Sequence, residues 1–196
     1  MQKELSDRLE IIPKEFNPIK EFVERYSQRE SQIDKLGTLQ LVKNPEFLDA
    51  YFINCFAPAI ETYFSNFESC YNFKIPKPLD EFLRFFNGFY FCDFTIYGLT
   101  PSIYKSEIGL LDRSVLQPLD IGTANDTWNK EYGQDGFHFG GRYYDDERNC
   151  GYFLKDEIIV SCLIDGEIVG TWTSFSDFLS DELTATEKNE TGLNKR

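Results

Sequence analysis

The sequence predicts an α+β protein, with one mainly antiparallel sheet, helices packed on it, and a helical region preceding it. The spacing of the apolar residues supports this, because it changes from helical to strand-like at Gly88 and changes again near Phe137. The composition supports it too. Phe and Tyr number 19 and 11 of 196 residues, so we expect a core built mainly from aromatic rings.

Residues 1–71 are expected to be helical. Apolar residues keep helical spacing over 16–26 and again over 47–67, and Gly37 separates the two stretches. Pro45 can open the second stretch, and Pro58 should kink or split it. We expect this region to pack on the main domain, residues 72–183.

The main domain opens with a helix that leads into a strand pair. Pro76 and Pro78 suit a first helical turn, and an apolar stripe predicts a helix over 79–86. Gly88 suits a left-handed position that ends a helix, at C′. Aromatic and β-branched residues then predict strands over 89–97.

The rest of the domain is expected to form a helix, four strands and a last helix. Residues 120–132 predict a helix, with Asp120 or Thr123 as its N-cap. Strands are expected over 137–139, 151–154, 158–163 and 168–172, with a hairpin turn at Asp165-Gly166. Ser174 can cap a last helix over 174–183, and the polar tail 184–196 should be frayed.

Several motifs in this order resemble one known family. Pro76-x-x-Leu-x-x-Phe-Leu-x-x-x-Asn-Gly precedes an aromatic strand that ends in Ile96-Tyr-Gly. The later motifs are Asn125 with Trp128, Phe137-His-Phe-Gly-Gly, Gly151-Tyr-Phe-Leu with Glu157-Ile-Ile-Val, and Thr173-Ser-Phe-Ser-Asp-Phe-Leu. Over residues 72–183 the chain therefore resembles the SMI1/KNR4 family of the SUKH superfamily.

The resemblance implies a fold and a function. The family fold is α+β with a mainly antiparallel sheet, and its bacterial members are largely immunity proteins that bind and neutralise toxins encoded beside them, frequently nucleases. A fungal branch acts as a scaffold and regulator of cell-wall synthesis. The resemblance thus implies a non-catalytic immunity protein with a cognate basic toxin as partner, or alternatively an intracellular scaffold. Asn87, Gly88, Tyr97, Gly98, Asn125 and Trp128 match the family pattern and are expected to determine the fold.

Charge narrows the classes of partner. The formal net charge is −13, and residues 75–183 carry 8 basic and 19 acidic residues. Such a field repels phosphate backbones, so we expect a basic protein partner and no direct nucleic-acid binding. A polar N-terminus, the lack of a long apolar run and five scattered Cys predict a cytoplasmic protein with reduced thiols and no membrane contact.

No motif predicts catalysis, a cofactor or a metal. The single histidine, His138, alternates with Phe137 and Phe139, and is expected to be a half-exposed strand residue. There is no Cys-x-x-Cys pair, phosphate-binding glycine loop or dinucleotide fingerprint. Trp128 and Trp172 are expected to pack in the core or an interface. An enzyme with an unrecognised site remains the third hypothesis.

One acidic surface is a candidate for partner binding. Its residues are Asp145, Asp146, Glu147, Asp156 and Glu157. We expect hairpin ends of one sheet to bring these two segments together, so that they steer a basic partner. The alternative is that both segments are ordinary solvated turns.

Overall fold

The computed structural model describes residues 2–47, 50–71, 73–100, 117–145 and 147–189, with the backbone alone at 2–4 and 128–130. Within these residues, nine antiparallel strands form one sheet in the order of the sequence. The strands are β1 (Ser31–Ile33), β2 (Leu39–Lys43), β3 (Tyr51–Cys55), β4 (Phe89–Phe91), β5 (Phe94–Ile96), β6 (Phe137–Tyr143), β7 (Asn149–Lys155), β8 (Ile158–Leu163) and β9 (Ile168–Trp172). The predicted α+β class with an antiparallel sheet is confirmed.

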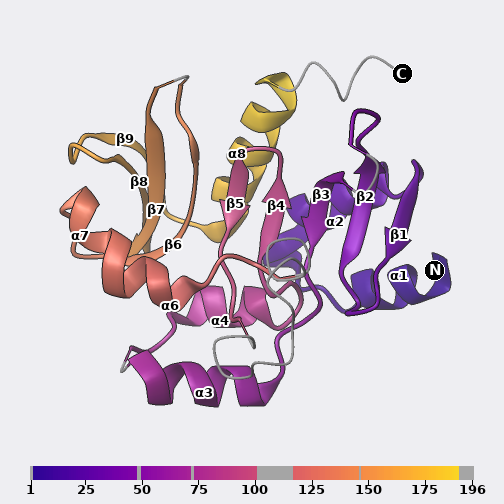
Figure 1. Cartoon of the computed structure of the whole chain (residues 1–196), viewed down its shortest axis with the longest axis horizontal. Coiled ribbons are helices and arrows are strands. Elements are labelled where there is room, and N and C mark those ends of the chain that lie inside the picture. The colour runs from indigo at the N-terminus through magenta and orange to yellow at the C-terminus, as the bar shows by residue number, and fades with distance from the viewer. Residues whose placement is uncertain (1, 48–49, 72, 101–116, 146, 190–196) are drawn as a thin grey trace.

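Helices cover both faces of this sheet and one of its ends (Figure 1). They are α1 (Gln2–Glu10), η1 (Lys14–Phe16), α2 (Asn17–Tyr26), α3 (Glu61–Tyr71), α4 (Lys77–Leu83), α6 (Ile121–Thr123), η3 (Ala124–Trp128), α7 (Asn129–Tyr132) and α8 (Phe175–Asn189). Helices α2 and α8 pack together on one face, and the α6–α7 segment, which includes a π-helical turn at η3, contacts β6 on the other. Helices α3 and α4 lie at one end of the sheet.

The core is aromatic, as the composition predicts, and it joins the N-terminal residues to the rest of the chain. Phe22 of α2 packs on Phe91 of β4, with ring centroids 4.8 Å apart. Phe178 of α8 packs on Tyr152 of β7 at 4.9 Å. A single cluster of buried apolar side chains extends from Leu5 to Leu183. The N-terminal residues therefore contribute to the same core as the sheet.

The prediction that residues 1–71 are helical is wrong at β1, β2 and β3. Helices α1, α2 and α3 do form, but three strands, β1 to β3, lie between α2 and α3 and extend the sheet. Ile53 and Cys55 are fully buried, and they alternate with Phe52 and Asn54, which are only partly buried. A dense run of apolar residues fits the spacing of a helix and the spacing of a strand. Here the segment is a strand because it pairs with β4.

The expected frayed tail after residue 183 is also wrong in part, because α8 continues to Asn189. Thr186 is fully buried, and the Tyr26 hydroxyl donates a hydrogen bond of 2.7 Å to Glu187. Arg25 forms an ion pair with the same carboxylate at 3.0 Å. Contacts with α2 thus hold a last turn that its polar sequence alone would not stabilise.

Two buried asparagines, one between α4 and β4 and one in η3, bind distant backbone groups. The side chain of Asn87 exchanges two hydrogen bonds of 2.7 Å with the backbone of Leu99. Asn125 does the same with the backbone of His138, both at 2.8 Å. Each amide replaces a backbone partner where regular pairing stops, which gives both asparagines the expected structural role.

Gly88 adopts the expected positive φ, +95°, but not at the expected place. Helix α4 ends at Leu83, earlier than predicted, and Gly88 lies at the entry to β4 rather than at the helical C′ position. A Cβ atom at Gly88 would lie 2.7 Å from the Cβ of Pro118 and 3.0 Å from the carbonyl oxygen of Ile96. Both the backbone angle and the lack of space therefore require glycine.

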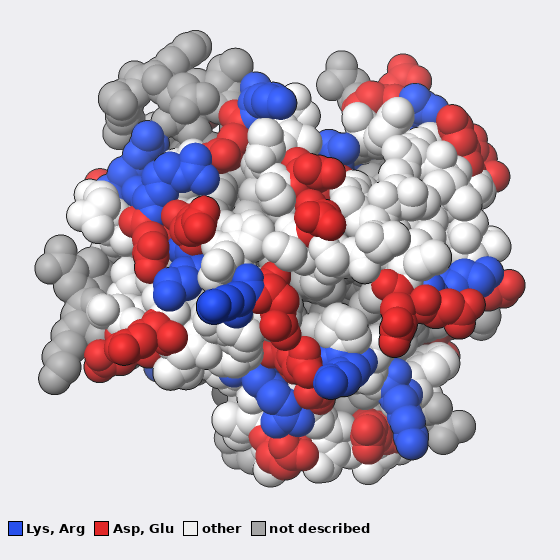
Figure 2. Space-filling view, turned by 180° about the vertical axis from the view of Figure 1, so that it is seen from behind, with Lys and Arg blue, Asp and Glu red and all other residues white. Residues whose placement is uncertain are grey.

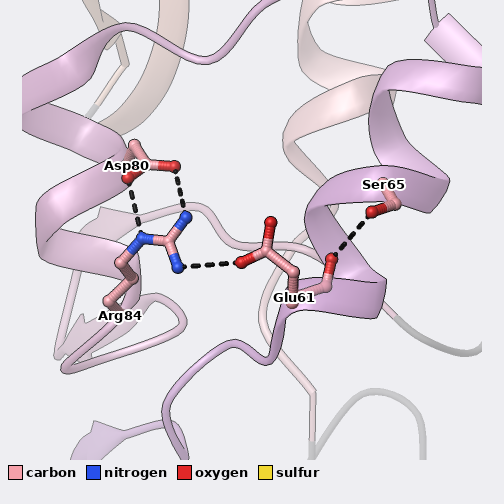
Figure 3. A network of polar contacts seen from close by, with 4 residues as sticks. All are labelled: Glu61, Ser65, Asp80 and Arg84. Carbon is pink, nitrogen blue, oxygen red and sulfur yellow. Dashed lines mark hydrogen bonds and ion pairs between the residues drawn. The ribbon is translucent and has the colours of Figure 1, made fainter.

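An exposed arginine joins α3 to α4 (Figure 3). Arg84 donates two hydrogen bonds to the Asp80 carboxylate, at 2.8 and 3.2 Å, and a third of 3.0 Å to Glu61. Its guanidinium also lies over the ring of Phe64, 4.4 Å from the centroid. The network links the two helices at the surface.

Candidate functional site

The five acidic candidates do not form one surface. Asp145 and Glu147 lie in the turn between β6 and β7, whereas Asp156 and Glu157 form the turn between β7 and β8. These turns stand at opposite ends of β7, whose seven residues span about 20 Å at the usual rise of a strand. Asp146 is outside the described residues. The expectation that these segments meet is wrong, because successive turns of a meander alternate between the two ends of the sheet.

The turn that does share an end with Asp145 and Glu147 is the one between β8 and β9. It carries Asp165 and Glu167, and Glu167 contributes to the electrostatic environment of Arg148. Together the two turns and the strand ends beside them expose ten described residues; one is Asn149, and the other nine carry the charges and the large apolar side chains. We call this the β6–β9 turn surface: Tyr143, Tyr144, Asp145, Glu147, Arg148, Ile164, Asp165, Glu167 and Ile168.

Asp145 has a structural role within this surface. Its carboxylate accepts backbone hydrogen bonds from Glu147 at 3.0 Å and Arg148 at 2.9 Å, and it forms an ion pair of 2.6 Å with the Arg148 side chain. The hydrogen bond from Arg148 is the main reason that the pKa of Asp145 is lowered. Asp145 therefore shapes the turn, and the carboxylates of Glu147 and Glu167 are better placed to meet a partner.

Large apolar side chains are exposed among these charges. Tyr143 is 61% exposed, Ile164 54% and Ile168 56%. Arg142 reaches Glu182 of α8, so Tyr143 points to the opposite face of the sheet. The pairing of Gly141 with Gly151, of Gly151 with Cys162 and of Cys162 with Ile168 places Ile168 on that same face. Exposed tyrosine and isoleucine side chains that share one face of the sheet make this surface a candidate for protein binding.

On the face opposite to the viewer of Figure 1, the acidic charge does not form one continuous field. Figure 2 shows the face that carries α2 and α8, where acidic groups lie in separate places with basic groups between them. The β6–β9 turn surface follows the same pattern, since Arg148 lies among four described carboxylates. A partner must therefore match a local arrangement, and overall charge can only guide its approach.

His138 is buried, with 1% of its surface exposed, so the expected half-exposed position is wrong. It does lie on the opposite face from Phe139, but the α6–α7 segment covers that face. Its ring stacks on Phe153 at 4.5 Å and meets Tyr132 at 5.2 Å, and Nε2 lies 3.0 Å from the carbonyl oxygen of Gly140. Burial lowers the pKa of His138 to about 4, so the ring is neutral at pH 7.

A buried charged group links β6 to α8, and the sequence predictions missed it. Nε of Arg142 lies 2.7 Å from Oε2 of Glu182, in an ion pair whose N–H is not aligned for a hydrogen bond. The Tyr152 hydroxyl donates a hydrogen bond of 2.7 Å to the same oxygen. Burial raises the pKa of Glu182. The available signal was that Glu182 falls on the apolar stripe of α8 with Phe178, Leu179 and Leu183.

A hollow of about 440 Å³ lies between α2 and α8. It is lined by Arg25, Tyr26, Arg29, Thr184, Glu187 and Lys188. Arg25 and Lys188 lie in the last turns of their helices, where cations complement the negative end of the helix dipole. That role accounts for their position without a ligand.

Other candidate chemistry is limited in the described part of the chain. No three side chains of His, Cys, Asp or Glu gather there as a possible metal site. The five cysteines are free, and Cys55, Cys150 and Cys162 are buried. Trp172 packs on Phe178 at 5.3 Å, as expected, and donates a hydrogen bond to Asp181. None of the described helices is long and apolar enough to cross a membrane.

Comparison with known proteins adds no identity. No family model, no curated protein and no solved structure matches the chain. Function must therefore be argued from the β6–β9 turn surface and from the sequence motifs.

Proposed function

We propose that the protein is a non-catalytic immunity protein that binds and neutralises a basic toxin domain, with a nuclease as the expected class. The observation that carries this proposal is the β6–β9 turn surface, which combines exposed tyrosine and isoleucine side chains with carboxylates. The motifs that resemble the SUKH superfamily point to the same function.

The two kinds of side chain on this surface have different tasks. A nuclease must present cations to hold phosphates, so a net charge of −13 favours its approach. Glu147 and Glu167 would speed association, whereas desolvation of Tyr143 and Ile164 would slow dissociation. Neutralisation then requires only that the bound protein obstruct the toxin's own site.

The test is association with the toxin domain encoded beside this chain, measured over a salt series. Glu147→Gln with Glu167→Gln should slow association and flatten its salt dependence, since exposed charges are screened beyond about 10 Å at 0.1 M salt. Asp156→Asn with Glu157→Gln is the matched control, because it removes the same charge at the opposite end of β7. Equal effects of the two pairs, or association that does not depend on salt, would contradict the proposal.

The apolar part has its own measurement. Tyr143→Ala with Ile164→Ala should raise the dissociation rate, with a loss of about 2 kcal/mol or more if these are central contacts. Both side chains are more than half exposed, so the fold should tolerate the change. An unchanged dissociation rate would place the interface elsewhere.

A further inference from the structure

Strand β9 is an edge of the sheet that lacks most of the usual protection against pairing. Among the described strands it pairs only with β8. Its sequence, Ile168-Val-Gly-Thr-Trp172, contains no charged residue and no proline. Natural edge strands usually carry such residues or are very short, because an open edge invites another strand.

The other edge of the sheet shows the contrast. Strand β1 has three residues, Ser31–Ile33, of which two are polar. Glu30, just before it, forms an ion pair of 3.5 Å with Lys43 on β2. A polar strand beside an ion pair is a protected edge. The two edges of one sheet therefore differ in the property that controls strand addition.

A bulge limits where pairing on β9 can occur. Ser161 pairs with Gly170 and Cys162 with Ile168, so Val169 is the extra residue. The regular part of the edge is then Gly170–Trp172. Three residues suffice in this sheet, because β1, β4 and β5 each pair over three residues.

We propose that β9 receives an extended, cationic segment of the partner as a tenth strand, an inference that rests on the proposed function and names the contact it uses. The β9 edge continues from the β6–β9 turn surface, since Ile168 belongs to both. Glu167 and Asp165 stand at one end of β9, and Asp181 is bonded to Trp172 at the other. Carboxylates at both ends favour a basic segment.

A second copy of this chain is the less suitable occupant. Two molecules of net charge −13 repel each other. The carboxylates that flank β9 would also meet a strand with the same flanks. Main-chain hydrogen bonds would supply affinity in either case, so charge decides between the two.

The experiment uses the full chain and a short synthetic peptide of alternating valine and arginine. Hydrogen exchange should slow within Gly170–Trp172, at the amides that point away from β8, when the peptide binds, on the order of tenfold at saturation. A peptide of the same sequence with N-methyl groups on alternate amides keeps the charge but cannot form a ladder. Equal binding of both peptides, or protection elsewhere in the chain, would overturn the inference.

Matched variants provide the second arm. Ile168→Lys with Thr171→Lys places cations on the edge and should abolish peptide binding. Ile11→Lys with Leu36→Lys makes the same charge change at exposed apolar positions elsewhere, 68% and 42% exposed, and should leave binding within about twofold. Equal loss in both pairs, or a dimer that forms through β9 without peptide, refutes a cationic occupant. If the peptide does not pair with β9 while Glu147 and Glu167 still control toxin association, only this inference is refuted and the proposed function stands.

Discussion

Replacement of Gly88 by alanine tests how the entry to β4 is built. Gly88 has a φ of +95°, and the Cβ of an alanine would lie 2.7 Å from the Cβ of Pro118. The variant therefore meets two separate penalties, one from the backbone angle and one from the lack of space. Gly133→Ala meets only the first, because Gly133 has a φ of +61° and no atom lies within 4 Å of the place that its Cβ would occupy.

The two penalties have different sizes. A left-handed conformation costs an L-residue about 1–2 kcal/mol. Overpacking against neighbours that cannot move costs about 1–3 kcal/mol more. The clash at Gly88 involves the proline ring and the backbone carbonyl of Ile96, which are stiff. We therefore expect a loss of about 2–5 kcal/mol for Gly88→Ala and about 1–2 kcal/mol for Gly133→Ala.

Urea denaturation measures both variants against the wild type. The midpoint should fall with little change in the m-value, since the surface exposed on unfolding stays the same. The difference between the two alanine variants isolates the steric part. If Gly88→Ala is no more destabilising than Gly133→Ala, Pro118 and Ile96 do not confine this turn.

Three further predictions concern buried and surface charges. Burial lowers the pKa of His138 from 6.5 to about 4, so the unfolded chain alone binds this proton between those values, and the free energy of unfolding should decrease by roughly 3 kcal/mol as the pH falls through that range. His138→Gln should remove this part of the pH dependence in denaturation experiments; the raised pKa values of Glu182 and Asp93 act with the opposite sign and remain in both proteins. Glu182→Ala should lower the free energy of unfolding by about 3 kcal/mol, because it leaves Arg142 buried without its main partner. The double variant Arg142→Met with Glu182→Leu should recover much of that stability. If the single and the double variant lose the same amount, the ion pair itself stabilises the fold. Arg84→Ala should lower the free energy of unfolding by about 1 kcal/mol, and by less in high salt. Lys77→Ala should have almost no effect, because the Lys77 side chain is 86% exposed in its pair with Glu81.

The sequence was most informative where turn residues and periodicity agree. The strands over 158–163 and 168–172 begin and end at the predicted residues, because Asp165-Gly166 marks the turn between them. The positive φ of Gly88 was also predicted correctly. The helix predicted over 47–67 is confirmed from Glu61 onward, where α3 forms, but it is wrong at β3 (Tyr51–Cys55), because a dense apolar run fits a helix and a strand equally well and only pairing with β4 distinguishes them.

The candidate surface failed for a topological reason. The acidic residues of two successive hairpin turns were grouped, although successive turns of an antiparallel meander lie at opposite ends. The same reasoning, applied to alternate turns, would have joined Asp145 and Glu147 to Asp165 and Glu167. The exposure of Tyr143 and the burial of His138 could not be derived this way, because both depend on where the α6–α7 segment and α8 cover the sheet.

The sequential order of the strands also bears on how such a chain can change in length. Each described strand pairs with its neighbours in sequence, so β1 to β3 could be gained or lost without rethreading β4 to β9. The stability of the two parts is not independent, because Phe22 of α2 packs on Phe89 and Phe91 of β4, with ring centroids 6.0 and 4.8 Å apart. The connectivity therefore permits strands to be added at an edge of the sheet. The shared aromatic core, however, requires that β1 to β3 and the helix α2 be gained or lost together.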